Sequence, residues 1–535
     1  MLHCDILVIG NGGAGLATAL SAYEKNANVI IVGETYPTRS QTCMAQGGIN
    51  AALGNISADS PKQHIDDTLK AAAGLASERM VKRLCESAPE TIFWLDAIGV
   101  PFSRTPENKI AQRRLGGTAN TRACYSQDYT GLKILHTLYD QVLAHEIPCL
   151  NERFLLDLAV ENNTAKGAFF YNIREGKIET ILAKSVVLAT GGYSGIYHGY
   201  TTNTRQSSGD GIAMAFRAGA VLSNMEFVQF HPTALKGSGI LISESARGAG
   251  GTLINQHGAR FTDELAPRDQ VSRAIWQELV KGDQVYLDIR HLGESFIDEY
   301  IPQERKLCLT YAGIDPVHEP IPIAPVAHYS MGGICVDQNH MSTINGLFAV
   351  GECANAKVHG ANRLGGNSLL EIIAFGRECG VSATNYATQS TAPHPVSDRH
   401  IADRLQQLLE LPQQQNFYDM RADTGSILYQ KAGILRDKAS LSFAKSTVEQ
   451  ITTQLPEMGI VDRGNIYNTN LIERLKFENS MVLARIVLES ALAREESRGA
   501  HFRTDFPQQH PDYHKESISF LDKGHLITRF QEVVS

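Results

Sequence analysis

The chain has 535 residues, 43% of them hydrophobic, which predicts two to four domains with hydrophobic cores of their own. Its formal net charge of −8 argues against a nucleic-acid-binding protein, although a local basic pocket could still hold an anionic substrate. The nine cysteines stand singly, which is typical of a reducing compartment and argues against an iron–sulfur cluster or a zinc site within the chain. No run of 18 apolar residues occurs, so we expect no membrane-spanning helix.

The N-terminal segment follows the pattern of a dinucleotide-binding βαβ unit. Residues 5–10 predict a buried parallel strand, residues 14–24 a helix, and residues 28–32 a second strand. Glycines in the turn between strand and helix would let a pyrophosphate approach the free N–H groups at the start of the helix. The turn consists of Gly10, Gly12, Gly13, Ala14 and Gly15.

An acidic residue is expected shortly after the second strand, where it would bind the ribose of a dinucleotide. Glu34 lies near this position, but a carboxylate that faces solvent is an open alternative. Three later stretches, 39–55, 189–193 and 359–371, combine glycines with small polar residues. Such stretches let the backbone lie against a flat ring system, so we expect them to line a ligand site.

After Phe227 the chain changes character, because charged residues at 243–251 and 267–269 stand among glycines and apolar segments. Their placement predicts a cleft within a domain inserted into the nucleotide-binding fold. Beyond Pro393, apolar residues recur at three- and four-residue spacing, which predicts a helical bundle and then an irregular tail. Individual elements are expected at 62–73, 78–97, 209–219, 398–411, 418–438, 441–455 and 470–496 for helices, and at 185–190 and 517–521 for strands.

Several long motifs, taken together, resemble the flavoprotein subunit of the succinate dehydrogenase and fumarate reductase family, with L-aspartate oxidase as a sibling family. The likeness covers nearly the whole chain. Besides the N-terminal glycine turn, it rests on the motifs at 45–48, 101–104, 229–233, 267–269, 328–333, 359–371 and 496–501.

The patterns and the resemblance together predict an α/β protein with a Rossmann-like FAD-binding domain, an inserted α+β capping domain and a C-terminal helical bundle domain. The FAD-binding domain is expected to comprise residues 1–231 and 327–392, and the capping domain residues 232–326. The helical domain would follow at 393–500 and the tail at 501–535.

The resemblance implies interconversion of fumarate and succinate by hydride transfer at the flavin N5 atom. Such chemistry requires both carboxylates to be held, charge that develops on one of them to be stabilised, and a proton donor on the opposite face. The resemblance implies that His328 and Arg363 bind one carboxylate. It implies that His231 and Ser243 bind the other.

Arg268 is the proton donor that the resemblance implies, and Glu244 and Arg247 would resupply its proton. An arginine is an unusual acid, because its pKa in solution lies above about 12. A buried arginine between a carboxylate relay and a forming carbanion could still give up a proton and be refilled at once.

The cofactor implied by the resemblance is FAD, with the glycine turn at the pyrophosphate and Glu352 at the ribityl chain. No metal ligand is predicted. Residues expected along the isoalloxazine ring or close to it are Ser40, Thr42, Gln46, Gly47, Gly48, Asp210, Arg363, Ser368 and Leu369.

Two positions depart from the family pattern. Membrane-bound members carry a histidine that bonds covalently to the flavin, whereas this chain has Gln41 there, so we predict non-covalent FAD. The flavin potential should then be lower, which favours fumarate reduction or oxidase chemistry over succinate oxidation. Aspartate oxidases carry a glutamate where this chain has Leu115, and an apolar residue favours a substrate without an ammonium group.

Two alternatives stay open: an L-aspartate oxidase, and a non-catalytic electron-transfer flavoprotein. The first is favoured by the missing histidine and by a chain shorter than typical respiratory members. Respiratory relatives dock an iron–sulfur subunit that passes electrons to a membrane quinone site, so we expect such a partner for a fumarate enzyme. The chain would then be cytoplasmic, held at the inner face of the cell membrane through partner subunits.

Overall fold

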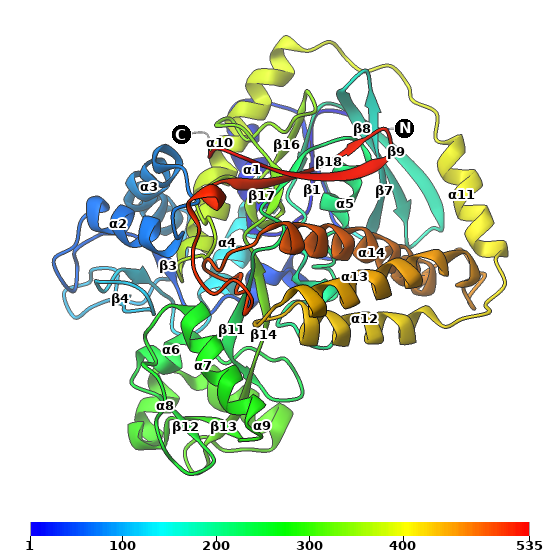
Figure 1. The fold of residues 1–535 in the computed structure, drawn as a ribbon. Helices are drawn as coiled ribbons and strands as arrows, with labels where there is room; N and C mark the ends of the chain where they lie inside the picture. The colour runs from blue at the N-terminus through cyan, green and yellow to red at the C-terminus, as the bar shows by residue number, and fades with distance from the viewer. Residues whose placement is uncertain (1, 534–535) are drawn as a thin grey trace.

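A seven-stranded sheet forms the centre of the structure, a computed structural model that describes residues 2–533 (Figure 1). The strand order is β6 (Cys149–Leu150), β2 (Val29–Val32), β1 (Leu2–Ile9), β9 (Lys177–Leu188), β8 (Thr164–Asn172) and β7 (Arg153–Glu161), with β16 (Leu347–Ala349) also paired to β9. The predicted βαβ unit is confirmed, because β1 and β2 are parallel and Ile6 lies opposite Val29. Since β1 also pairs with β9, its inner part is buried, which explains its continuous apolar run.

The antiparallel strands β7 and β8 extend this sheet where the sequence patterns predict no element. Asn162 and Asn163 connect them, and both have positive φ angles, of 48° and 56°. Asparagine tolerates this conformation better than most residues, which suits a tight hairpin turn. The Asn-Asn pair between two apolar runs is therefore the signal for this hairpin. The strand predicted at 185–190 is the end of β9.

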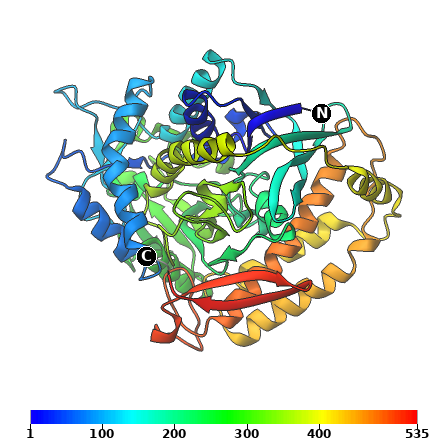
Figure 2. The ribbon, with the colours of Figure 1, turned by 90° about the horizontal axis from the view of Figure 1, so that it is seen from above.

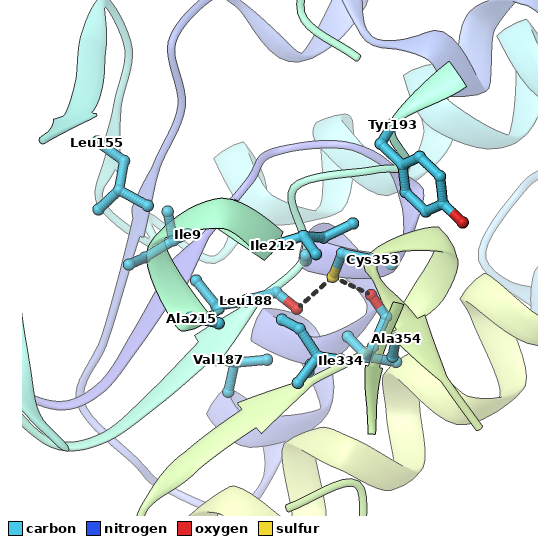
Figure 3. Packing of buried hydrophobic residues seen from close by; sticks show 14 of the residues in the cluster. Ile9, Leu155, Val187, Leu188, Tyr193, Ile212, Ala215, Ile334, Cys353 and Ala354 are labelled. Atoms are coloured by element: carbon cyan, nitrogen blue, oxygen red, sulfur yellow. Dashed lines mark hydrogen bonds between the residues drawn. The ribbon is translucent and has the colours of Figure 1, made fainter. Parts of the chain in front are cut away.

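Two helices pack against each other beside the sheet, α1 (Gly13–Glu24) and α10 (Asn367–Gln389). Glycine allows this close approach, because a Cβ atom at Gly380 would lie 2.5 Å from the carbonyl oxygen of Thr18. The packing fixes the start of α10, and with it the motif at 359–371, next to the N-terminal glycine turn. Figure 3 shows the apolar core nearby, where the Cys353 thiol donates to the Leu188 carbonyl at the end of β9.

A four-stranded sheet and short helices form the lobe at the bottom of Figure 1. This lobe has its own core, which includes Leu253, Ile275 and Leu287. Two of its strands, β11 and β14, continue past the predicted boundaries at 232 and 326 and join the lobe to the main body. The capping domain with those boundaries stays a prediction. Its elements are β11 (Val228–Leu235), α6 (Glu244–Gly248), β12 (Thr252–Asn255), α7 (Arg268–Val280), β13 (Val285–Asp288), α8 (Glu294–Tyr300), α9 (Pro302–Ala312) and β14 (Ile321–Ser330).

The predicted helices after residue 393 are present, with their ends moved by a few residues. They are α11 (Arg399–Glu410), α12 (Phe417–Lys431), α13 (Lys438–Thr453) and α14 (Thr469–Ala493). The helix expected at 418–438 ends at Lys431, and Asp437 then caps the separate helix α13 by accepting the N–H of Ser440 at 2.9 Å. The tail is less irregular than expected: β18 (Glu516–Asp522) and β19 (His525–Gln531) form a hairpin that packs on α14 (Figure 2).

The helices predicted earlier in the chain are also found, and one further helix was not predicted. They are α2 (Pro61–Ala71), α3 (Glu78–Ala97), α5 (Asp210–Arg217) and the unpredicted α4 (Thr130–Ala144). Within residues 2–533, no helix is both long and apolar enough to cross a membrane. The same residues contain no group of three His, Cys, Asp or Glu side chains arranged to hold a metal ion.

Candidate active site

One continuous pocket joins the carboxyl end of β1 to the strands of the lower lobe. The structure brings nearly all predicted site residues to its wall. They are Gly10, Gly12, Gly13, Ala14, Ser40, Thr42, Gln46, Gly47, Gly48, Asp210, His231, Ser243, Glu244, Arg268, His328, Glu352, Arg363, Ser368 and Leu369. Gly15 and Arg247 are not at the wall but lie behind it, against Gly10 and Glu244 respectively.

The N-terminal glycine turn is folded so tightly that side chains are excluded from it. Gly10 has a φ of 112°, and a Cβ atom there would lie 2.1 Å from the Ala189 carbonyl oxygen. A Cβ atom at Gly15 would lie 1.9 Å from the Gly10 carbonyl oxygen. Gly12 has no side chain to cap α1, and among the first-turn N–H groups that of Gly13 donates to Thr42 Oγ1 at 3.1 Å, while the start of the helix lines the pocket as an anion site would require.

Several polar side-chain atoms along the pocket are buried without a hydrogen-bond partner. They fit the polar edge of FAD, because buried polar groups in proteins are nearly always paired. The backbone of the glycine turn and that of residues 189–191 both line the pocket here. The unpaired atoms include Ser40 Oγ, Gln46 Oε1 and Nε2, Thr190 Oγ1, Thr204 Oγ1 and Arg363 Nε.

Glu34 lines the pocket with its side chain 21% exposed, which favours the binding role over a carboxylate that faces solvent. The ammonium group of Lys476, on α14, donates to its carboxylate. Burial raises the pKa of Glu34, and Lys476 opposes that rise. The helical segment thus reaches the cofactor end of the pocket, and a second contact supports it, since Asn479 donates to Asp210 at 2.5 Å.

Glu352 and Arg363 lie where the two ends of the pocket meet, and the Arg363 guanidinium extends into the lower end. Glu352 accepts hydrogen bonds from the N–H and hydroxyl of Ser330 at 2.9 and 3.1 Å, and burial raises its pKa to about 7. Arg363 donates to Ser368 Oγ at 2.9 Å and stacks over the Tyr329 ring at 4.2 Å. Burial lowers the pKa of the Arg363 guanidinium to about 10, so it stays charged at neutral pH.

At the lower end, Arg268 and Arg363 share one partner, the amide of Gln229. Its Oε1 atom accepts from Arg268 Nη1 at 3.1 Å and from Arg363 Nη2 at 3.1 Å. Arg268 also donates through Nε to Glu244 Oε2 at 3.1 Å. Gln229 belongs to the motif at 229–233, but the sequence predicted no role for it. The signal was its spacing from His231, because alternate residues of a strand face the same side.

The two predicted histidines lie side by side, with ring centroids 5.0 Å apart. Burial and then Arg268 lower the pKa of both rings well below the usual range, so both are neutral at neutral pH. The backbone N–H of Thr233 donates to His231 Nδ1 at 3.3 Å, which leaves the ring proton on Nε2. His328 Nδ1 lies 2.7 Å from the hydroxyl oxygen of Thr202.

Glu244 is held by donors on several sides. Its Oε1 atom accepts from the Gly116 N–H at 3.0 Å and lies 3.6 Å from Arg247 Nη2. Burial favours the protonated form, but Arg268 and Arg247 outweigh it and hold the pKa of Glu244 below its ordinary value. Gly116 and Gly365 leave no free space, because Cβ atoms there would lie 2.4 and 2.8 Å from its oxygens. Glu244 is therefore a charged, fully enclosed partner of two arginines.

Ser243 begins α6 and is held through its backbone. Its N–H donates to the carboxyl group of Glu304, with both oxygens at 3.2 Å, and its hydroxyl oxygen accepts from the Ser245 hydroxyl at 2.8 Å. The Ser243 hydroxyl proton is thus available for a ligand. Leu115 is buried and lines the same pocket, where the motif offset predicted it.

Comparison with known proteins identifies the family. Residues 5–369 match the FAD binding domain family, and residues 421–533 match the C-terminal family of fumarate reductase flavoproteins. The chain is 39% identical to a fumarate reductase flavoprotein subunit of Mycobacterium tuberculosis, over 98% of both chains. It belongs to the flavoprotein-subunit family of succinate dehydrogenase and fumarate reductase. This membership makes it an FAD-dependent oxidoreductase, as the motifs predicted.

Further flavoprotein subunits of this family agree in sequence and in structure. A succinate dehydrogenase flavoprotein subunit of Rickettsia bellii is 37% identical over 99% of this chain and 95% of its own length. A quinol-fumarate reductase solved with menaquinol molecules superposes with a TM-score of 0.95 at 36% identity, covering 100% of this chain and 98% of the other. An adenylylsulfate reductase of Archaeoglobus fulgidus, 19% identical, shares the fold with a TM-score of 0.83. The predicted fold class is confirmed.

Proposed function

We propose that this chain interconverts fumarate and succinate, with Arg268 as the proton donor. The observation that supports the proposal is the single pocket in which two buried arginines and two neutral histidines face the wall predicted to hold FAD. FAD, once bound, would supply or accept the hydride at its N5 atom. The protein residues would hold the diacid, stabilise its charge and move the proton.

The clamp residues match the two carboxylates of a small diacid. Arg363 with His328 would bind one carboxylate, and His231 with Ser243 would bind the other. Neutral imidazoles donate a single proton each, and the guanidinium supplies a fixed positive charge. Gln229 fixes the spacing of the two arginines, because its Oε1 atom accepts from both.

Proton transfer would run along Arg268, Glu244 and Arg247. Arg268 would lose a proton to the substrate carbon as the second C–H bond forms, which leaves a neutral guanidine beside the ionised Glu244 carboxylate. Glu244 would then accept a proton from Arg247 across 3.6 Å and pass it to Arg268, and a proton from water would return to Arg247, whose Nη1 is anchored on the Glu264 carbonyl at 2.6 Å. Low exposure of all three side chains keeps bulk water from competing for the proton.

A substrate without an amine fits the pocket better than L-aspartate does. Leu115 lines the wall where an aspartate oxidase would carry a glutamate for the substrate ammonium group. An ammonium group beside Leu115 and near Arg268 would be buried without a carboxylate of its own, which is costly. L-Aspartate oxidation therefore stays the second candidate.

We propose that FAD is bound without a covalent link to residue 41. Gln41 has no nucleophilic ring nitrogen, and its Oε1 atom accepts the N–H of Thr204 at 2.9 Å. Acid precipitation of the holoprotein should release the flavin into the supernatant. Flavin that stays with the precipitate would contradict this proposal.

An iron–sulfur subunit leading to a membrane quinone site is the partner we propose. Two solved relatives are described as a quinol-fumarate reductase with menaquinol molecules and as Mycobacterium smegmatis Sdh1 in complex with UQ1. Within residues 2–533, all nine cysteines are free and none forms a cluster site, so electrons would need a separate carrier to reach a quinone. We place the chain on the cytoplasmic side, held at the membrane by such partners.

The test is reoxidation of the chemically reduced holoprotein, followed by flavin absorbance under anaerobic conditions. Fumarate should reoxidise the flavin quickly, malonate should perturb the spectrum without turnover, and L-aspartate should not reduce the oxidised protein. Rapid reduction by L-aspartate would overturn the proposal in favour of the oxidase. A flavin spectrum indifferent to both fumarate and malonate would indicate the electron-transfer flavoprotein without dicarboxylate chemistry.

A further inference from the structure

Thr202 lies in the loop before α5 and is not among the predicted site residues. It nevertheless contacts His328, one of the residues proposed to bind a substrate carboxylate. Its hydroxyl oxygen is 2.7 Å from His328 Nδ1. The loop is attached to β14 directly before that histidine, since the Thr202 N–H donates to the Ala327 carbonyl at 2.9 Å and the Ala327 N–H donates to the Tyr200 carbonyl at 2.9 Å. The hydroxyl is therefore held in register with the imidazole ring.

Gln41 holds the same loop from the cofactor side. Its Oε1 atom accepts the Thr204 N–H at 2.9 Å, and its Nε2 atom donates to the Thr202 carbonyl at 3.5 Å. Gln41 begins the short helix at Gln41–Met44, which lines the cofactor end of the pocket. Two side-chain contacts thus lead from the cofactor loop to a clamp histidine.

We infer that Thr202 is a positioning residue that fixes the tautomer and orientation of His328, and that Gln41 acts through Thr202. This inference rests on the proposed function, in which His328 donates a hydrogen bond to a substrate carboxylate. Position 41 would then couple the cofactor loop to substrate affinity, in addition to lacking the flavin link.

The tautomer follows from the single proton of the Thr202 hydroxyl. Two acceptors compete for it, His328 Nδ1 at 2.7 Å and Asn203 Oδ1 at 3.3 Å. We assign the hydroxyl proton to His328 Nδ1, since 2.7 Å is a normal length for a hydroxyl donor and lies at the short limit for a ring N–H donor, whereas the 3.3 Å contact with Asn203 is long. His328 then carries its own proton on Nε2, where it can be donated to a carboxylate.

The companion histidine reaches the same state by another route. His231 Nδ1 accepts the backbone N–H of Thr233, a donor that no side-chain substitution removes. His328 depends on a side-chain hydroxyl instead. Without that hydroxyl its proton can move to Nδ1, and the bare Nε2 lone pair would then face a carboxylate oxygen. The clamp would lose one hydrogen bond and gain a repulsive contact.

The experiment compares Thr202→Val, which keeps the shape but removes the hydroxyl, with Thr202→Ser, which keeps the hydroxyl. The matched control is Thr201→Val, which removes the neighbouring hydroxyl that does not contact His328. Malonate dissociation constants from flavin difference spectra and fumarate kcat and KM are measured on FAD-loaded protein. We expect Thr202→Val to raise the malonate Kd and the fumarate KM about tenfold, with a smaller change in kcat. Thr202→Ser and Thr201→Val should stay within about twofold of the wild type.

A double-mutant cycle tests the role of Gln41. Gln41→Ala should raise the malonate Kd about threefold, and the Gln41→Ala/Thr202→Val pair should be no weaker than Thr202→Val alone, because both act on one hydrogen bond. Additive effects, or a Thr202→Val protein that binds malonate like the wild type, would overturn the inference while the proposed function stands. If wild-type protein binds neither fumarate nor malonate, the proposed function fails and the inference falls with it.

Discussion

At the cofactor end of the pocket the wall is mostly backbone, whereas at the lobe end it consists of buried charged side chains. Gly10 and Gly48 form the first wall in conformations with positive φ, of 112° and 129°. Arg268, Glu244 and Arg363 form the second, each nine-tenths buried or more. The first end excludes atoms to make room for a flat ligand, and the second end places charges around a small one.

This difference determines which substitutions each end tolerates. At the cofactor end, a single added methyl group meets backbone that cannot move aside. At the lobe end, a change in size is less serious than the loss of one partner, because the remaining buried charge is left without compensation. The comparison predicts that substitutions at the two ends separate FAD binding from turnover.

The largest effect is expected for Arg268→Lys. A lysine ammonium cannot reach both Glu244 and Gln229 as the guanidinium does, and it lacks the planar arrangement of N–H donors. We expect kcat for fumarate reduction to fall about 10²- to 10⁴-fold, in the range for loss of a positioned acid. Bound FAD per protein, from the absorbance ratio of flavin to protein, should not change.

Arg273→Lys provides the matched control for this substitution. Arg273 lies five residues further along α7, pairs with Asp269 at 2.7 Å and donates to the Gly499 carbonyl at 3.1 Å, and it does not line the pocket. Its replacement should leave kcat within about twofold. An Arg268→Lys protein that keeps more than a tenth of the wild-type kcat would remove Arg268 from the role of acid and would weaken the contrast between the two ends.

The second effect, at the backbone end, is expected for Gly10→Ala. Alanine at a φ of 112° is strained, and its methyl group would lie 2.1 Å from the Ala189 carbonyl oxygen, so β1 and the 189–191 backbone must move apart. We expect the FAD dissociation constant to rise by a factor of about 10 to 100, as about 1–3 kcal/mol of strain would give. Fluorescence titration of the apoprotein with FAD measures it.

Gly99→Ala separates backbone strain from cofactor contact. Gly99 has a similar φ of 106°, but a Cβ atom there meets nothing within 4 Å. The variant should lose some stability and keep its FAD affinity. Equal loss of FAD affinity in both variants would mean that backbone strain alone weakens FAD binding, rather than the displacement of the glycine turn from the 189–191 backbone.

The cofactor end could be predicted from the sequence because its residues are neighbours in the chain. Gly10 and Gly15 belong to one strand–turn–helix pattern, which is a local feature. The lobe end could be predicted only by matching long motifs, because Glu244, Arg268 and Arg363 come together through three separate elements. The role of Gln229 was missed for the same reason: its spacing from His231 indicates the strand face it occupies, but nothing local shows that two arginines converge on its amide.

Glu304 illustrates what no local pattern reveals. It stands in α9 among charged residues, as in an exposed helix, yet it is fully buried. Its burial comes from contact between the start of α9 and the loop before α4, where Asp128 accepts the Gln303 N–H at 2.7 Å. The packing of α9 against this loop places the Glu304 carboxyl group behind Ser243, and the composition of α9 does not reveal it.

A further effect, on stability rather than on turnover or FAD binding, is expected for Glu304→Gln, measured against pH. Burial, and then the nearby Asp128, raise the pKa of Glu304 from an ordinary 4.5 to about 8, so the folded protein keeps a proton that the unfolded chain releases. A raised pKa gives stability that is fully present below about pH 4.5 and is lost as pH rises to about 8, at up to about 1.4 kcal/mol per unit. Glutamine keeps an oxygen acceptor for Ser243 and cannot ionise.

The free energy of unfolding, measured with urea between pH 5.5 and 8, should therefore decline less steeply in the variant. The exposed Glu299→Gln control should decline like the wild type. Parallel declines in all three proteins would show that Glu304 is already ionised in the folded state, and the lobe end would then carry one more buried charge than this structure assigns to it.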